Sequence, residues 1–346
     1  MSAGFTSTDT GMFVRVPAWH RIGNVPTEYP GSWAEARKFA ELEWDPTLAP
    51  LFGFKGIKAD LSVSYDPADA TAGDYFAEQG KVRIIRSDNG YTLGVAGSGY
   101  TVINHTELGE ILEAVLGTGN TLQYDTLFSL YGGKLVCCAV KLDEPIQVRG
   151  DASLIYPYVA LTAKHDGEGA VRLQSTSVRA VCQNTISMAE AQADRSGTVF
   201  SFRHSGAWRD RIDEAKLAMT GVRRDFARFG EIADVLARTP ITTSIEDAFV
   251  ALMVPEPPAG LISTRVHNNV ARSREQLRAC ITGTAKDGDT TAGTRGTAFG
   301  LWQASVEYLD HYRRARTLDS YAARTLLNRE SMKTSALAVI RELVKG

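Results

Sequence analysis

The stretch VRIIRSDNGYTLGVAGSGYTVINHTELGEILEAVL, from Val82 to Leu116, decides the fold class because strands, a turn and a helix follow one another in it. β-branched and aromatic residues fill 82–85 and 91–95, and Asp88-Asn89-Gly90 between them is typical of a hairpin turn. We expect Thr106 to cap the helix that follows. The apolar positions of this helix recur at helical spacing, at Leu108, Ile111, Leu112 and Val115.

Two more hairpins and another helix are expected after this unit. Paired apolar runs flank short glycine-rich turns, at 127–131 with 134–142 and at 154–164 with 171–176. A helix from Ser177 to about Gln192 is expected to follow. Consecutive hairpins followed by helices indicate an α+β fold with a mostly antiparallel sheet, in which helices cover one face and the other face is left for solvent or a ligand.

A long amphipathic helix is predicted from Trp208 to Leu236. Its apolar positions alternate steps of four and three residues, at Trp208, Ile212, Ala215, Met219, Val222, Phe226, Phe229, Ala233 and Leu236. A narrow apolar seam of this kind needs a partner. The spacing leaves two partners open: another helix of the same chain, at 297–316 or 318–343, or a second copy of the chain, in which case the seam makes a homo-oligomer.

Shifts in composition divide the chain into four parts. Residues 1–60 read as an irregular and partly helical segment, 61–205 as the α+β core, 206–254 as the long helix with a shorter one, and 255–346 as a basic helical region. Within the last part, 282–296 reads as a flexible loop because it lacks apolar periodicity. Residues 261–346 carry 14 Lys and Arg against 8 Asp and Glu, a net charge of +6. An anionic partner would bind there, although solvated helix faces explain the same excess.

Composition and cysteine usage favour an intracellular protein, which we expect in the cytoplasm of a bacterial host. Of the 346 residues, 44% are hydrophobic and 23% charged, as in ordinary soluble proteins. The sequence contains no apolar run of membrane-spanning length, and its first residues lack the features of a signal peptide. The four cysteines show no metal-ligand spacing and are expected to be buried free thiols.

Catalytic and metal-binding motifs are absent from the sequence. It holds no GxxxxGK[ST] phosphate loop and no GxSxG elbow. The six histidines are scattered, and none stands at the HxH, HExxH or HxxxH spacing of metal ligands. We therefore expect a protein without enzymatic activity, cofactor or metal.

Candidate nucleic-acid-binding residues occur on the second sheet hairpin and in the basic C-terminal region. Arg172 and Gln174 share a strand face because alternate side chains of a strand point the same way, and Lys164, Tyr156 and Tyr158 lie on the neighbouring strand. Cations and tyrosine rings on one face fit the backbone and the bases of a single strand, but an ordinary solvated face fits equally well. The candidates are Lys164, Arg172, Gln174, Arg179, Asn184, Arg295, Arg313 and Arg314.

Three separated motifs resemble those of an uncharacterised family known as "phage/plasmid-like protein". They are GYTVIN at 99–104, SVRAVCQNT at 177–185, and GTAFGLW at 296–302 with YLDHY at 308–312. The resemblance spans most of the chain, from Trp19 onward. It implies an origin on a phage, prophage or plasmid, and it supplies no catalytic residues.

Two functions remain open at this point. Hairpins feeding a helix, with an oligomerising appendage, also describe the single-strand annealing recombinases of phages, which is an analogy of fold alone. The first hypothesis is therefore a protein that binds single-stranded DNA and serves annealing or recombination. The alternative is a protein-interaction or host-takeover factor that acts through its helical region.

Overall fold

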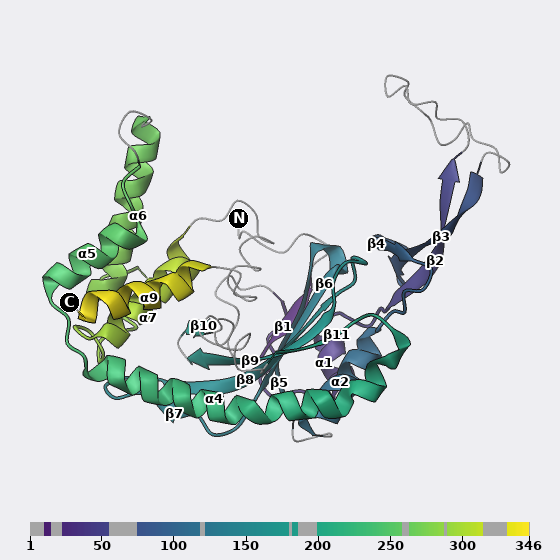
Figure 1. Ribbon diagram of the computed structural model, residues 1–346, viewed down its shortest axis with the longest axis horizontal. Helices are drawn as coiled ribbons and strands as arrows, with labels where there is room; N and C mark the ends of the chain where they lie inside the picture. Colours follow the sequence, from purple (N-terminus) through teal and green to yellow (C-terminus); the bar gives the residue numbers. More distant parts are fainter. Residues whose placement is uncertain are drawn as a thin grey trace.

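The computed structural model describes residues 10–14, 23–54, 75–117, 122–179, 182–185, 199–257, 263–286, 289–313 and 331–345. Within them, the chain forms an eight-stranded sheet, a three-stranded sheet and several helices, so the predicted α+β class is confirmed. Figure 1 shows the helices mainly on one side of the large sheet and at one end of it.

The large sheet is antiparallel throughout. Its strands are β1 (Gly11–Phe13), β5 (Gln123–Leu130), β6 (Leu135–Lys141), β7 (Ile146–Gln147), β8 (Leu154–Lys164), β9 (Val171–Arg179), β10 (Cys182–Thr185) and β11 (Val199–Phe202). The main path is β1-β5-β6-β8-β9-β10, while β11 pairs with β9 and β7 with β8. Both predicted hairpins are confirmed, β5–β6 through the turn at Tyr131–Gly133 and β8–β9 through the turn after Lys164.

The helix predicted from Ser177 to Gln192 is wrong where the structure describes this segment. Strand β9 continues to Arg179, which pairs with Ile155, and then turns back into β10. The remaining residues of the predicted helix lie outside the described ranges. Apolar spacing over such a short run fits a helix and a strand alike, and pairing with β8 satisfies the backbone in extended form.

The opening stretch folds as predicted, except at the helix cap. Strands β3 (Tyr75–Arg86) and β4 (Thr92–Gly97) form the predicted hairpin, and α2 (His105–Leu116) follows it. Strand β2 (Pro46–Phe54), which the sequence did not predict, pairs with β3 and completes the antiparallel three-stranded sheet. The cap is Asn104, not Thr106. Asn104 accepts a hydrogen bond from the backbone N–H of Glu107, and the Glu107 carboxylate accepts one from the backbone N–H of Asn104, both at 2.9 Å. This reciprocal pair satisfies two helix-end donors, so the helix begins before Thr106.

Three helices cover one face of the large sheet (Figure 1). They are α1 (Trp33–Phe39), which is capped by Ser32, α2 and α4 (Ile212–Arg238). Trp33 fixes α1 in place, because its ring packs on Tyr124 and its indole N–H donates to the backbone carbonyl of His105 at 2.6 Å. The buried side chains between these helices and the sheet form the larger of the two hydrophobic cores.

The predicted long helix is α4, and its seam is buried within the chain. Trp208 lies in the 3₁₀ turn Gly206–Arg211 just before the helix. Met219 and Val222 belong to the sheet core, whereas Phe229 belongs to a second core among the C-terminal helices. Ile212 and Phe226 are half-buried against these cores. The seam therefore packs on α2 and the large sheet along its first half and on the C-terminal helices along its second half.

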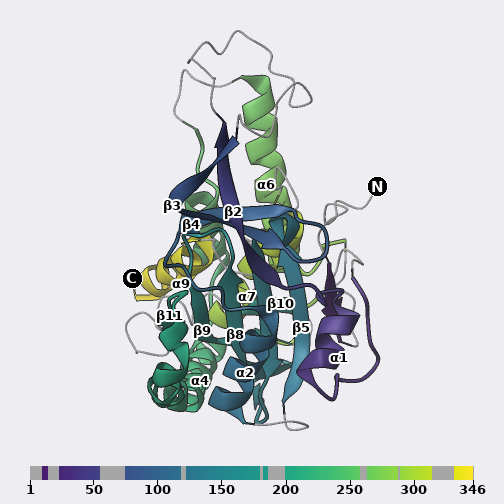
Figure 2. The same cartoon turned by 90° about the vertical axis from the view of Figure 1, so that its right-hand side faces the viewer.

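The C-terminal helices surround one central helix. They are α5 (Thr243–Met253), α6 (Thr264–Thr282), α7 (Ala298–Glu307), the π-helix Tyr308–Tyr312 and α9 (Ser331–Lys345). Every residue of α7 is buried. Helix α6 rises away from the rest of the molecule in Figures 1 and 2, and its first residues, 264–269, are exposed.

The segment that was expected to be a flexible loop, 282–296, has fixed contacts in its described part. Thr291 and Thr294 are each only 2% exposed. Arg295 forms an ion pair with Asp289. Its glycines and threonines suggested flexibility, but the small side chains instead let the segment pack closely on the rest of the chain.

Candidate nucleic-acid interface

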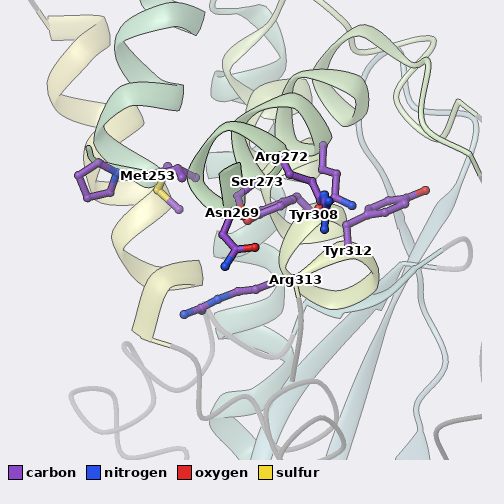
Figure 3. A pocket seen from close by; sticks show the side chains of 10 residues that line it. Met253, Asn269, Arg272, Ser273, Tyr308, Tyr312 and Arg313 are labelled. Atoms are coloured by element: carbon purple, nitrogen blue, oxygen red, sulfur yellow. The ribbon is translucent and has the colours of Figure 1, made fainter. Parts of the chain in front are cut away.

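A cavity of about 490 Å³ opens among the C-terminal helices. Its walls are the end of α5, one face of α6, and the π-helix with the residue after it. Figure 3 shows the side chains that line it. This volume lies within the range of roughly 300–1,000 Å³ that is usual for ligand pockets. We call it the arginine–tyrosine pocket, after Arg272, Arg313, Tyr308 and Tyr312.

Helix α6 contributes a polar face to the pocket. Asn269, Arg272, Ser273 and Gln276 line the cavity, and steps of three and four residues place them on one side of the helix. Ser263 starts this helix, because its hydroxyl accepts a hydrogen bond from the backbone N–H of Val266 at 3.4 Å. Apolar residues are sparse on this face, so it has little to bury and remains open to a ligand.

The π-helix supplies the other side of the pocket. The backbone N–H of Arg313 donates to the carbonyl of Tyr308 at 2.9 Å, which is the five-residue step of a π-helix. Tyr308 is only 3% exposed, whereas Tyr312 and Arg313 are half-buried. In Figure 3, Tyr308 lies in the middle of the cluster, and Tyr312 and Arg313 extend to opposite sides. Short π-helical turns are common at functional sites because the wider turn redirects side chains.

The described residues that line the pocket include two arginines and no acid. The two guanidinium groups are those of Arg272 and Arg313. Two neighbouring arginines of α6 are neutralised by acids. Arg274 pairs with Glu256 and Arg278 with Asp247, each at 2.5 Å. The exposed Arg272 pairs with no acid in the described part of the chain. Such a site favours an anionic ligand that also has a flat ring to stack on tyrosine.

The sheet residues proposed from the sequence lie apart from this pocket. Arg172 is exposed on β9 and its guanidinium donates to the hydroxyl of Ser201 at 3.4 Å. Gln174 shares that face of β9 but is only 6% exposed, and Lys164 is half-buried at the end of β8. Arg179 and Asn184 lie on β9 and β10.

The tyrosines expected to stack bases are already engaged. Tyr158 is buried, and the ring of Tyr156 lies under the ammonium group of Lys141, with 3.6 Å from the nitrogen to the ring centroid. These rings are therefore not presented to a ligand as the sequence suggested.

The three candidates proposed from the C-terminal region lie in different places. Arg313 lines the pocket, Arg295 is held by Asp289, and Arg314 lies outside the described residues. The sequence missed Arg272, Tyr308 and the α6 face. One signal was available, because Asn269, Arg272, Ser273 and Gln276 repeat at helical spacing in a region with a positive net charge.

No group of three or more His, Cys, Asp and Glu side chains in the described ranges is arranged to hold a metal ion. Cys137, Cys138 and Cys280 are buried free thiols, as predicted. None of the described helices combines the length and the apolar character needed to cross a membrane.

Comparison with known proteins gives one match. A family model described as "Domain of unknown function (DUF932)" matches residues 92–332, which is more than half of the chain. No curated protein and no solved structure matches the chain. The matched residues include the β4–α2 unit, the β8–β9 hairpin and the arginine–tyrosine pocket. The expectation of an uncharacterised family is thus confirmed, and the chain belongs to the DUF932 family.

Proposed function

We propose that this protein binds single-stranded nucleic acid, without enzymatic activity, in the arginine–tyrosine pocket and along the adjoining face of α6. The observation that carries the proposal is the composition of the pocket: two arginines, Arg272 and Arg313, and two tyrosines are among the described residues that line one cavity. Guanidinium groups pair with phosphate oxygens, and aromatic rings stack on bases.

A single strand suits this pocket better than a duplex. Bases in a duplex are stacked on one another, so their faces are not available to Tyr312, the half-buried tyrosine of the pocket. In a single strand, one base can enter the cavity while its phosphates remain at the rim, where the exposed Arg272 lies. Recognition of this kind tolerates many sequences, because every base offers a flat face.

The polar face of α6 extends the positive charge beyond the pocket. Arg265 precedes Arg272 by seven residues, or about two helical turns, so both side chains project from the same side of α6. Asn269 lies between them on that side, and all of the residues 264–269 are exposed. Together these residues form a track along which a strand can run from the pocket toward the free end of α6.

The proposal is tested by fluorescence anisotropy with a labelled oligo-dT on the order of 20 nucleotides, longer than the roughly 4–16 nucleotides of a typical single-strand site. Binding should weaken as salt rises, with a slope of about 0.7 for each phosphate contacted. The double variant Arg272→Gln/Arg313→Gln should bind weakly and with a smaller slope.

The matched control for the single variant Arg272→Gln is Arg278→Gln, which also removes one positive charge from α6 but lies outside the pocket. It should bind like the wild type. Absence of binding by the wild type at low salt would refute the proposal. So would equal losses of affinity in Arg272→Gln and the control, since binding would then follow net charge alone.

An origin on a phage or mobile element, and a role in annealing or recombination, are parts of the same proposal. Annealing is checked by mixing complementary strands with and without the protein and following duplex formation. Self-association belongs to the proposal as well, and it needs a surface other than the α4 seam, which the chain itself covers. If a defined host protein copurifies and DNA is ignored, the alternative of a protein-interaction factor replaces this proposal.

A further inference from the structure

Three histidines that are far apart in the sequence meet in the interior. His105 begins α2, His165 follows β8, and His204 follows β11. The ring centroids of His105 and His165 are 5.3 Å apart, and those of His165 and His204 are 5.8 Å apart. All three residues are buried, at 1%, 0% and 8% exposure. We call this group the histidine cluster.

Aromatic rings from both ends of the three-stranded sheet close the cluster. Trp44, just before β2, meets His105 edge to face, with 4.4 Å between ring centroids. Tyr100, just after β4, stacks on His204 with 4.9 Å between ring centroids. Five rings therefore form a continuous row, and the small sheet contributes the two outer ones.

The polar atoms of this row are poorly satisfied. Both ring nitrogens of His105 and His165, and Nε2 of His204, are buried without a hydrogen bond of normal geometry. The same holds for the indole N–H of Trp44 and the hydroxyl of Tyr100. Buried polar groups without partners are costly, and a charged imidazole would cost far more than a neutral one. The packed state therefore requires neutral rings.

Backbone contacts beside the cluster join the two sheets directly. A Cβ added to Gly94 of β4 would lie 2.1 Å from the carbonyl oxygen of Asp166, in the turn that begins at His165. In the same turn, a Cβ on Gly167 would lie 2.5 Å from the carbonyl oxygen of Val95. Because β4 and this turn touch through backbone, separating the sheets and opening the cluster are one event.

Charged groups face the cluster from two sides. Asp45 lies near His105, where it pairs with Arg37 at 3.2 Å and accepts the backbone N–H of His105 at 2.9 Å. Asp166 lies on the side of His204 and Tyr100. Arg86 stacks on the outer ring, Trp44, and is neutralised by Asp88.

These surroundings depress the imidazole pKa values. Burial lowers the pKa of His105 to about 4, although the charge of Asp45 opposes this shift. Burial and the two neighbouring imidazoles hold the pKa of His165 well below its ordinary value. Burial also lowers the pKa of His204, against the opposing effect of the nearby Lys164 backbone and of the Asp166 charge.

We propose that the histidine cluster is an acid-labile latch, which holds the three-stranded sheet on the large sheet and releases it when the imidazoles are protonated. The latch does not depend on nucleic-acid binding. Because the histidine pKa values are depressed in the closed state, protonation does not destabilise that state above about pH 6.5, the ordinary pKa of histidine. The stabilisation is lost as the pH falls from about 6.5 toward the depressed pKa values. His105 alone, at a pKa of about 4, would raise the opening equilibrium constant about 30-fold at about pH 5.

Hydrogen exchange followed by mass spectrometry tests the latch at about pH 7.5 and about pH 5, with rates corrected for intrinsic exchange. Peptides covering β4 and residues 165–169 should lose protection at the lower pH, whereas peptides from β6 should keep theirs. Equal protection of β4 at both pH values would overturn the proposal. Loss of protection in β4 and β6 together would also overturn it, since acid would then unfold the whole sheet.

Two variants and one control assign the effect to the cluster. His165→Phe removes the central titrating ring and keeps an aromatic group, so the acid-induced loss of protection should be smaller than in the wild type. His204→Gln provides the same test if His165→Phe does not fold. The control His267→Gln removes an exposed histidine of α6 and should leave the response unchanged. An unaltered response in the folded cluster variant, or an equal change in the control, would contradict the latch.

Discussion

The indole ring of Trp302 meets the phenyl ring of Phe229 edge to face, with 6.2 Å between ring centroids and 61° between ring planes. This contact joins α4 to α7, the helix that is buried on every side. Val222, two turns earlier on α4, belongs instead to the sheet core. One helix thus carries two successive apolar surfaces and ties the C-terminal helices to the sheet.

Truncating Phe229 should loosen that connection. Phe229→Ala is expected to lower the free energy of unfolding by about 3–5 kcal/mol, because a buried ring is lost and a cavity remains. The control Leu217→Ala changes a side chain of the same helix that is 74% exposed, and its effect should stay within about 0.5 kcal/mol. Guanidinium denaturation monitored by circular dichroism measures both. Equal stability of the two variants would mean that the Phe229–Trp302 contact is not made.

The α4 seam shows what periodicity can and cannot predict. Steps of three and four residues correctly indicated a long helix with one buried face, since that spacing follows from helix geometry. They did not indicate the partner, because an apolar stripe packs on a sheet as well as on another helix. Apolar spacing over a short run fits a helix and a strand alike. The run from Ser177 was therefore predicted as a helix although it pairs as strands β9 and β10.

The contact between Gly94 and Asp166 gives a test of how the sheets dock. Gly94→Ala would place a methyl group 2.1 Å from a backbone oxygen, so strand β4 or the β8–β9 turn must move. We expect the free energy of unfolding to fall by about 1–3 kcal/mol, as for overpacking in cores. The control Gly99→Ala has open space around the added atom and should melt like the wild type. A Gly94→Ala protein with an unchanged melting temperature would show that the two segments do not touch.

The start of α2 can be tested by one conservative and one disruptive change at the same position. Asn104→Ala removes the side-chain oxygen that accepts from the N–H of Glu107 and should cost about 1 kcal/mol. Asn104→Asp keeps an acceptor there and should retain most of the stability, because both residues are favoured helix caps. Chemical denaturation measures the difference. If both variants were equally destabilised, the capping interaction would not be the cause.

Sites assembled from distant segments explain most of what the sequence left unpredicted. Arg313 was proposed from the charge of its region, and it does line the pocket. Its companion Arg272 lies on another helix, and nothing in the local sequence connects the two. The histidine cluster is a stronger case, since His105, His165 and His204 stand at no recognisable spacing and meet only when two sheets pack together.

Substitutions at Tyr312 separate the contribution of base stacking to binding affinity from the contribution of charge. Tyr312→Leu should weaken binding to oligo-dT by about 1–3 kcal/mol, the usual value of one stacked base. Tyr312→Phe keeps the ring and should bind nearly as tightly as the wild type. The salt slope should stay the same in both, because neither change removes a cation, whereas Arg272→Gln should reduce the slope by about 0.7. Anisotropy titrations at several salt concentrations measure affinity and slope together, and thermal melting confirms that each variant is folded. A folded Tyr312→Leu protein with wild-type affinity would remove stacking from the mechanism and leave phosphate contacts alone to explain binding.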